Sequence, residues 1–485
     1  MISAKSGYVE EARSVKYLQN VVRRRRAERL EQRMDAEPRP EQSAFRRFES
    51  SPIHRAPWLE DRQQRGAACH GSSNLKVLHT SDWHLGQSLH GRKRYEEFKS
   101  FLDWLSAVME AEGIDVLLIA GDVFDSSTPS NRAQELYYDF LLKASRTCCQ
   151  NIVVIAGNHD SPSFLDAPKE ILRSLNVYVI GQKAETAEGE VLVLHGEGSR
   201  PQAIVCAVPY LRDRDIRIVE PGESVEEKGA KLVAGIKEHY RDVCELAERK
   251  QLELSKEGHP KIPIVVMGHL FMVGGKTVSG GEIGELGSLT QVGADIFPAS
   301  INYVALGHLH IPQRVDGAGH IRYCGSPIPL SFGEAKQEKT VIIAEFGDAP
   351  PNIHVMPIPC FQALESIVGS LDEITAGLSR LCEDGSDAWL EIEYTGAELV
   401  GNLWEIFHES IADSSMEIRR IKNRVFSARA LAPIQDEEML ENLDFHQVFE
   451  SCLDDSKIPP DERNGLLASY NEILQLLSEK DPRAD

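Results

Sequence analysis

The sequence predicts an α/β fold in which two sheets pack face to face and helices cover the outside. Two observations support this prediction. Between Leu75 and Phe346, short apolar runs typical of buried strands alternate with longer stretches whose apolar residues have helical spacing. A second series of strands follows the first from Val191 onward, and two packed sheets flanked by helices would accommodate that order.

The first half of this region alternates regularly between the two kinds of element. The predicted strands are Leu75–Thr80, Val116–Ala120, Ile152–Ala156 and Val177–Ile180. The predicted helices are Tyr95–Met109, Asn131–Ala144 and Phe164–Leu175. In the first of these helices Phe98, Phe101, Leu102, Leu105 and Val108 share one face, which indicates a helix packed on a core.

The second half is richer in strands and contains one long charged helix. The strands expected there are Val191–Leu194, Ala203–Val208, Ile262–Met267, Tyr303–Leu306, Ile321–Cys324 and Thr340–Phe346. The helix spans Val225–Glu253. We therefore expect one large domain over residues 75–350.

A smaller α/β unit is expected over residues 351–432 and a helical segment over 433–485. The smaller unit is predicted as strand, helix, strand, helix, strand: His354–Ile358, Ala363–Leu381, Trp389–Tyr394, Ala397–Ala412 and Glu417–Phe426. Two amphipathic helices, Glu437–Leu453 and Pro460–Leu477, follow a linker that contains Pro433. They are too small for a core of their own, so they pack on the smaller unit or against a partner chain.

Residues 1–74 differ from the rest of the chain in charge and pattern. They hold 15 Lys and Arg against 10 Asp and Glu, a net charge of +5 that includes the run Arg23–Arg26, whereas the whole chain carries −22. We expect little packed structure there. A basic DNA-binding arm and an upstream region wrongly included in the reading frame both fit these residues.

Composition excludes several classes of protein. The longest apolar runs, such as Val116–Ala120, are far too short to span a membrane, and no N-terminal stretch resembles a secretory signal. Nine scattered cysteines without metal-site spacing suggest reduced thiols in a cytoplasmic protein. The strongly negative charge argues against nonspecific wrapping of nucleic acid but leaves room for a local phosphate-binding site.

Polar segments follow the predicted strands at five points. They are Asp82-Trp83-His84, Gly121-Asp122-Val123-Phe124-Asp125, Gly157-Asn158-His159-Asp160, Gly268-His269 and Gly307-His308-Leu309-His310. Each segment alone could be a turn. Because the ends of parallel strands can meet at one edge of a sheet, the polar side chains of the five segments are expected to lie together there. A mixed set of carboxylate, amide and imidazole donors suits Mn²⁺, Fe²⁺ or Zn²⁺ better than Ca²⁺. A pair of such ions is suited to phosphate-ester hydrolysis. We expect Asp122, central in this order, to bridge two ions.

The five segments in this order resemble the signature of the calcineurin-like metallophosphoesterases, whose fold is a two-sheet sandwich. The resemblance implies two ligand sets that share Asp122. Asp82, His84 and His310 would surround one ion, and Asn158, His269 and His308 the other. It also implies that His159 protonates the leaving oxygen while Asp125 holds its other ring nitrogen. His159 could instead be a hydrogen bonder without a proton role, and Asp160 is expected to cap the turn.

Further stretches resemble one branch of that superfamily, the bacterial SbcD-type nucleases. They are residues 82–92, 157–163, 208–212, 303–310 and 323–332. The resemblance implies a Mn²⁺-dependent nuclease with double-strand 3′→5′ exonuclease and single-strand endonuclease activity. It implies a capping role for the smaller unit and a coiled-coil ATPase partner, SbcC, which the C-terminal helices would bind. It further implies a homodimer within a heterotetramer, located in the cytoplasm at the nucleoid.

Arg92, Lys93 and Arg94 follow the first ligands and could contact the DNA backbone, or they could form a solvated loop. Two other functions remain open at this point. A phosphoesterase of the same fold could act on phosphoproteins or nucleotides. A non-enzymatic scaffold for an ATPase is also conceivable, although it would be expected to lack ligands, and none is missing.

Overall fold

A computed structural model describes residues 74–217, 223–275, 291–347, 350–396, 400 and 402–423. They all belong to one compact unit, Cys69–Asp485. The N-terminal extension and both predicted C-terminal helices lie outside the described residues. The predictions made for them therefore stay predictions.

The first sheet has six strands in the order β14-β13-β1-β4-β5-β6. Its parallel strands are β1 (Leu75–Thr80), β4 (Val116–Ala120), β5 (Asn151–Ile155) and β6 (Val177–Ile180). β13 (Thr340–Phe346) and β14 (Asn352–Pro357) close one edge as antiparallel strands. Every residue of β4 and β5 is buried, which explains why both are continuous apolar runs in the sequence.

The second sheet also has six strands, in the order β11-β12-β10-β9-β8-β7. Its parallel strands are β8 (Pro201–Ala207), β9 (Ile264–His269), β10 (Tyr303–Gly307) and β12 (Ile321–Tyr323). The antiparallel edges are β7 (Val191–His195) and β11 (Gln313–Arg314). The long helix α9 (Val225–Lys256) begins at a capping box between Ser224 and Glu227.

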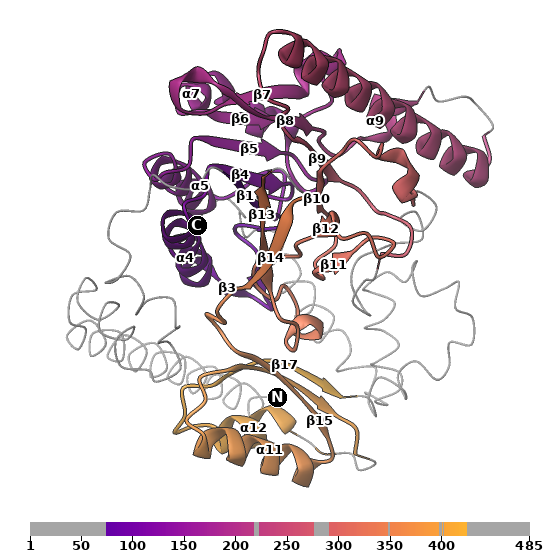
Figure 1. The fold of residues 1–485 in the computed structure, drawn as a ribbon. Coiled ribbons are helices and arrows are strands. Elements are labelled where there is room, and N and C mark those ends of the chain that lie inside the picture. The colour runs from indigo at the N-terminus through magenta and orange to yellow at the C-terminus, as the bar shows by residue number, and fades with distance from the viewer. Residues whose placement is uncertain are drawn as a thin grey trace, which may run out of the picture. The chain divides into compact units, whose positions relative to one another are not determined.

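The two sheets face each other, and helices cover their outer faces, as the sequence predicts (Figure 1). Residues of both sheets, among them Leu118 and Val265, form the buried layer between them. α4 (Tyr95–Glu112) and α5 (Asn131–Ala144) pack on the first sheet, and α9 packs on the second. The shorter helices and 3₁₀ turns are α6 (Pro162–Asp166), α7 (Lys169–Arg173), α8 (Asp213–Ile216), η2 (Ala187–Gly189), η3 (Glu197–Ser199), η4 (Ala294–Ile296) and η5 (Phe332–Glu334).

In its described part, the smaller unit contains three parallel strands and two helices around a core of its own. These elements are β15 (Leu364–Gly369), α11 (Leu371–Glu383), β16 (Trp389–Tyr394), α12 (Leu403–Ser410) and β17 (Glu417–Asn423). The predicted helix over 363–381 is wrong in its first part, which forms β15. The capping box of Ser370 and Glu373 starts the helix only at Leu371.

Two other element predictions also need correction. The strand predicted at His354–Ile358 exists as β14, but it pairs with β13 in the first sheet and does not belong to the smaller unit. The helix predicted over Phe164–Leu175 is two short helices, α6 and α7, with Pro168 between them as the residue before α7. Proline has no N–H to donate, so it favours a break in a continuous helix at this point.

A short hairpin connects the first ligand segment with the smaller unit. It consists of β2 (Ser88–Leu89) and β3 (Arg92–Lys93). Leu89 forms a buried cluster with Phe332, and with Leu364 and Trp389 of the smaller unit. The hairpin therefore brings the smaller unit into contact with the segment that carries Asp82 and His84.

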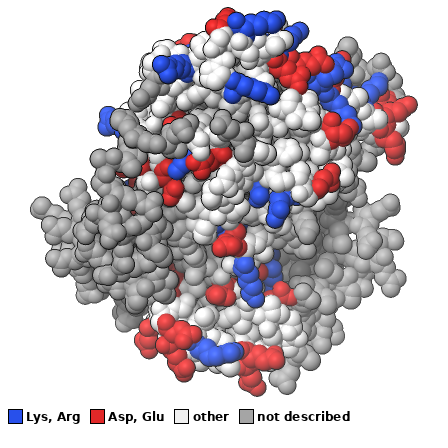
Figure 2. All heavy atoms as spheres, in the orientation of Figure 1, with Lys and Arg blue, Asp and Glu red and all other residues white. Residues whose placement is uncertain are grey.

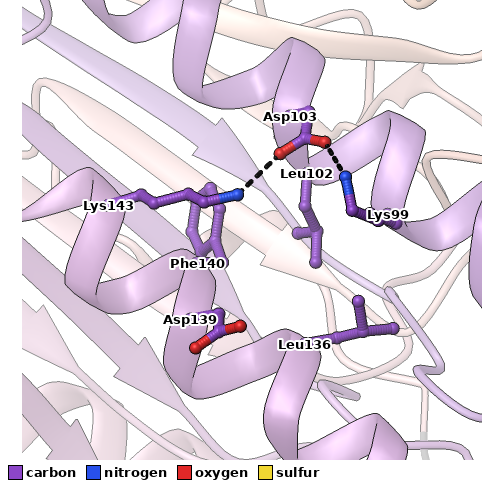
Figure 3. A pocket seen from close by; sticks show the side chains of 7 residues that line it. All are labelled: Lys99, Leu102, Asp103, Leu136, Asp139, Phe140 and Lys143. Carbon is purple, nitrogen blue, oxygen red and sulfur yellow. Dashed lines mark hydrogen bonds and ion pairs between the residues drawn. The ribbon is translucent and has the colours of Figure 1, made fainter. Parts of the chain in front are cut away.

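The surface of the described residues carries charges of both signs. Acidic and basic side chains are interspersed over the face shown in Figure 2. A small pocket between α4 and α5 is lined by Lys99, Leu102, Asp103, Leu136, Asp139, Phe140 and Lys143, where Asp103 accepts from both lysines (Figure 3). It contains no candidate ligand. Among the described residues, no helix has the length and apolar character needed to cross a membrane.

Candidate metal centre

The polar segments predicted from the sequence lie together where the parallel strands of both sheets end. Asp82 follows β1, Asp122 follows β4 and Asn158 follows β5, all in the first sheet. His269 ends β9 and His308 follows β10, two neighbouring strands of the second sheet that pair Gly307 with His269. The backbone N–H of His308 donates to Asp82 Oδ1 at 2.9 Å. The two sheets thus supply adjacent halves of one polar cluster.

Several residues of the cluster have a left-handed backbone conformation, which residues other than glycine rarely adopt. Asp82, His84, Asp122 and His308 have φ values of 52°, 47°, 50° and 97°. Such left-handed residues cost of order 1–3 kcal/mol each and are enriched at functional sites. A Cβ atom at Gly307 would lie 1.9 Å from the carbonyl oxygen of Ala120. Glycine before His308 therefore lets the two sheets approach closely.

Asp122 occupies the centre of the cluster and faces both predicted ligand sets. Its Oδ2 lies 3.5 Å from Nε2 of His84 and 3.3 Å from Nε2 of His269. Its Oδ1 accepts the backbone N–H of His159 at 2.9 Å. A carboxylate held between imidazoles of the two sets has the position that a bridging ligand requires.

The other predicted ligands lie around Asp122 in two overlapping groups. Ligand atoms of Asp82, His84 and His310 lie within 4.8 Å of one another, and so do those of Asp82, Asp122 and His269. Asn158 Oδ1 lies 3.0 Å from Nε2 of His269 and 3.0 Å from Nδ1 of His308. The structure therefore brings all seven predicted ligands into one cluster.

The orientation of the imidazoles fits metal ions. Nδ1 of His269 lies 2.9 Å from the carbonyl oxygen of Ala120 and therefore donates its proton to it, which leaves Nε2 as the nitrogen that faces Asp122. Nε2 of His84 is buried and has no hydrogen-bond partner in the described part of the chain. An imidazole that donates outward through one nitrogen and presents the other inward is typical of a metal ligand.

The electrostatics of the cluster favour bound cations. Burial lowers the pKa of His84, but its hydrogen bond to Asp125 and the charges of nearby carboxylates outweigh this and raise it to about 9. The pKa of His269 is also raised to about 9, because Asp122 outweighs burial. Burial alone would raise the pKa of Asp122, yet the imidazoles of His269 and His84 hold it well below its usual range. Protons on these imidazoles occupy places that divalent ions could take.

Burial and the charge of His269 lower the pKa of His308 to about 4. His308 is therefore already neutral at physiological pH, which is the form that binds a metal ion.

His159 and Asp125 lie beside the cluster, but their mutual contact differs from the prediction. Nδ1 of His159 lies 3.0 Å from the backbone carbonyl oxygen of Asp125, while the carboxylate of Asp125 lies 3.3 Å from Nδ1 of His84. The predicted contact between that carboxylate and the ring of His159 is therefore wrong. Asp160 caps the turn as expected, because it accepts the backbone N–H groups of Val123 and Gly157 at 3.1 and 2.9 Å.

The predicted basic trio splits into residues with different environments. Arg94 is 2% exposed, its guanidinium donates to Glu97 at 2.7 Å, and it also donates to the carbonyl oxygen of Pro329. The prediction that Arg94 contacts DNA is therefore wrong, because its charge is buried and paired. Arg92 is half exposed and lies 3.1 Å from Glu417 of the smaller unit, and Lys93 is exposed.

Glu334 is a further residue beside the cluster, and it belongs to none of the five polar segments. Its Oε1 lies 3.4 Å from Nδ1 of His310, although the two residues are 24 positions apart. No local pattern signals this contact, because a single Glu after a glycine carries no metal-site spacing.

Comparison with known proteins agrees with this geometry. Residues 75–312 match the family model of calcineurin-like phosphoesterases, and residues 360–457 match the type 5 capsule protein repressor C-terminal domain.

Several relatives share about a third of their aligned residues with the chain. The SbcD component of the SbcCD nuclease of Escherichia coli K12 is 32% identical over 414 residues, which cover 83% of this chain and 99% of that protein. The protein of the same name from Rhodobacter capsulatus is 36% identical over 63% of this chain and 76% of its own length. That of Bacillus subtilis is 32% identical over 56% and 66%. The chain therefore belongs to the calcineurin-like phosphoesterases and, within them, to the SbcD family of the SbcCD nucleases.

Proposed function

We propose that this protein is a Mn²⁺-dependent DNA nuclease that hydrolyses phosphodiester bonds at a centre of two metal ions. The observation that carries the proposal is the convergence of seven oxygen and nitrogen donors at the strand ends of two sheets, with Asp122 between them. The names of the relatives, which are components of a nuclease, support nucleic acid as the substrate.

Asp82, His84 and His310 would hold one ion, Asn158, His269 and His308 the other, and Asp122 would contact both. Mn²⁺ suits this set because it accepts hard oxygens and imidazole nitrogens together. When bound, the two ions would withdraw charge from the phosphodiester oxygens and make water more acidic.

His159 is placed to deliver a proton. Its ring is fixed by the contact of Nδ1 with the carbonyl oxygen of Asp125 at 3.0 Å, and its backbone N–H is fixed on Asp122. Because Nδ1 donates to a carbonyl, Nε2 is the nitrogen that is left to protonate the leaving oxygen. Its ring centre lies 4.7 Å from that of His84, at the edge of the metal cluster. The carboxylate of Asp125 contributes by orienting His84 through Nδ1.

The proposed activity is 3′→5′ exonuclease action on double strands and endonuclease action on single strands, in a complex with an SbcC-like ATPase. The relatives are named as parts of the SbcCD complex. We propose a homodimer of this chain within a heterotetramer, in the cytoplasm at the nucleoid. Arg92 and Lys93, at the hairpin that touches the smaller unit, are the proposed backbone contacts to DNA.

The test is a cleavage assay with the purified full chain, Mn²⁺ and labelled duplex, hairpin and single-stranded DNA, with and without the ATPase partner. We expect cleavage of single strands by the chain alone and ATP-stimulated shortening of duplex 3′ ends with the partner. Hydrolysis of a phosphopeptide or a free nucleotide, without any cleavage of DNA, would refute the proposal in favour of another phosphoesterase.

A further inference from the structure

Glu334 and Lys339 form a buried ion pair directly behind His310. Their side chains are each 4% exposed, and Nζ of Lys339 lies 2.5 Å from Oε2 of Glu334. Moving a charged group from water into the protein interior costs several kcal/mol per ion, and the attraction between the two charges must offset this cost. Because a buried ion pair adds little net stability and this one lies beside a candidate metal ligand, its location points to a functional role.

The two oxygens of Glu334 have different environments. Oε2 accepts from Lys339 Nζ, from the hydroxyl of Ser326 at 3.3 Å and from the backbone N–H of Leu330 at 3.2 Å. Oε1 instead faces Nδ1 of His310 at 3.4 Å. The three donors fix the carboxylate, so its second oxygen can fix the imidazole.

Lys339 acts on the same histidine from a second direction. Its Nζ donates to the carbonyl oxygen of His310 at 3.1 Å and to Oγ of Ser326 at 2.9 Å. The ion pair thus holds both the ring and the main chain of His310. With Nδ1 turned to Glu334, the other ring nitrogen is left to face Asp82 and His84.

Three of the candidate imidazole ligands share this arrangement, but their outer acceptors differ. Nδ1 of His269 contacts a main-chain carbonyl and Nδ1 of His84 contacts the half-exposed Asp125. Only His310 among the four candidate histidine ligands has an outer carboxylate that is itself buried and paired with a lysine.

We propose that Glu334, clamped by Lys339, is a positioning residue that orients His310 and thereby sets the affinity of one of the two metal positions, the one formed by Asp82, His84 and His310. The inference rests on the proposed metal centre but not on DNA as its substrate. Loss of the outer contact weakens that position and leaves the position of Asn158, His269 and His308 intact.

The experiment is a calorimetric titration of metal-stripped full-length protein with MnCl₂, with electron paramagnetic resonance to separate paired from single Mn²⁺. In Glu334→Gln, which keeps the shape of the side chain, one binding event should weaken by roughly 10–100-fold, while the other stays within about twofold. The resonance signal should change from a coupled pair to single ions at Mn²⁺ concentrations that saturate the wild type.

Glu190→Gln is the matched control. Glu190 is another fully buried carboxylate paired with a histidine, His239, at 2.7 Å, and neither residue contacts a candidate ligand. This variant should bind both ions as the wild type does. Should Glu334→Gln fail to fold, Glu334→Asp keeps the charge beside Lys339, withdraws the carboxylate from His310 and carries the same expectation.

A combination with His310→Gln tests whether the effect passes through that histidine. In this background Glu334→Gln should cause no further loss of metal affinity. The inference is overturned if folded Glu334→Gln binds both Mn²⁺ ions as the wild type does, or if its two binding events weaken equally. It is also overturned if Glu190→Gln weakens one binding event to the same extent as Glu334→Gln. A wild-type chain that binds no pair of Mn²⁺ ions would instead refute the metal centre itself.

Discussion

The charge of the metal centre predicts how the stability of the metal-free protein depends on pH. The pKa values of His84 and His269 are raised to about 9, since neighbouring carboxylates outweigh the effect of burial. In an unfolded chain a histidine titrates near 6.5. The folded state therefore binds these two protons more tightly than the unfolded state does. This stabilisation is fully present below pH 6.5 and is lost as the pH rises to about 9.

The size of the effect follows from the two shifts. One pKa unit corresponds to about 1.4 kcal/mol, so each imidazole contributes about 3 kcal/mol at most. Both interact with Asp122, so their contributions are not independent, and we expect a total loss of about 3–6 kcal/mol. The pKa values of His308 and His79 are lowered to about 4 and about 3, so these residues are neutral in the folded state. Near pH 6.5 they oppose the fall only slightly, because the same imidazoles are then losing their last protons in the unfolded chain.

The assay is urea unfolding of the metal-stripped protein, followed by circular dichroism, at several pH values from 6.5 to 9. The free energy of unfolding should fall across this range, and bound Mn²⁺, which replaces the protons, should remove the fall. Asp122→Asn should flatten the profile of the metal-free protein, because the carboxylate shared by both imidazoles is gone. A free energy that stays constant or rises with pH in the metal-free wild type would refute the reasoning.

Three further predictions concern residues with separable roles. His159→Gln should retain both ions while the turnover number falls by roughly two to four orders of magnitude, and parallel loss of metal in atomic absorption would make His159 a ligand. Arg92→Ala should lower the salt dependence of DNA binding by about one counterion. Arg94→Ala should leave Glu97 buried and unpaired and lower the free energy of unfolding by about 3–5 kcal/mol. Loss of DNA binding in Arg94→Ala, with loss of stability in Arg92→Ala, would mean that the two residues have the opposite roles. Truncation after Pro433 should preserve Mn²⁺-dependent cleavage of single strands, weaken binding to the ATPase and remove ATP-stimulated duplex resection. A pull-down in which the truncated chain binds the ATPase at full affinity would place that interface elsewhere.

The fold and the ligand cluster could be predicted because both depend on patterns that are local in sequence. Fully buried strands such as β4 and β5 are short continuous apolar runs, and each delivers a polar residue directly after its end. Asp122 and Asn158 lie close together because they follow neighbouring parallel strands, whose carboxyl ends meet at the same edge of the sheet.

What could not be predicted depends on contacts between distant parts of the chain. The burial of Arg94 requires the carbonyl of Pro329, which is 235 positions away. The pairing of β14 with β13 is a tertiary contact, and an isolated run of apolar residues does not reveal which sheet it joins. The partner of the Asp125 carboxylate is His84 because of how two loops meet, and the spacing of Gly-Asp-x-x-Asp does not specify this. The sequence of β15 predicts a helix wrongly, because the apolar residues of a segment of only six residues fit both the helical and the strand periodicity.

The most direct test of the central claim is a crystal structure of the Mn²⁺-soaked full chain with anomalous scattering measured at the manganese edge. The proposed centre predicts two anomalous peaks that both contact Asp122. One would lie among Asp82, His84 and His310 and the other among Asn158, His269 and His308. A single peak, or two peaks that leave Asp122 without a metal contact, would contradict a dinuclear centre bridged by this carboxylate.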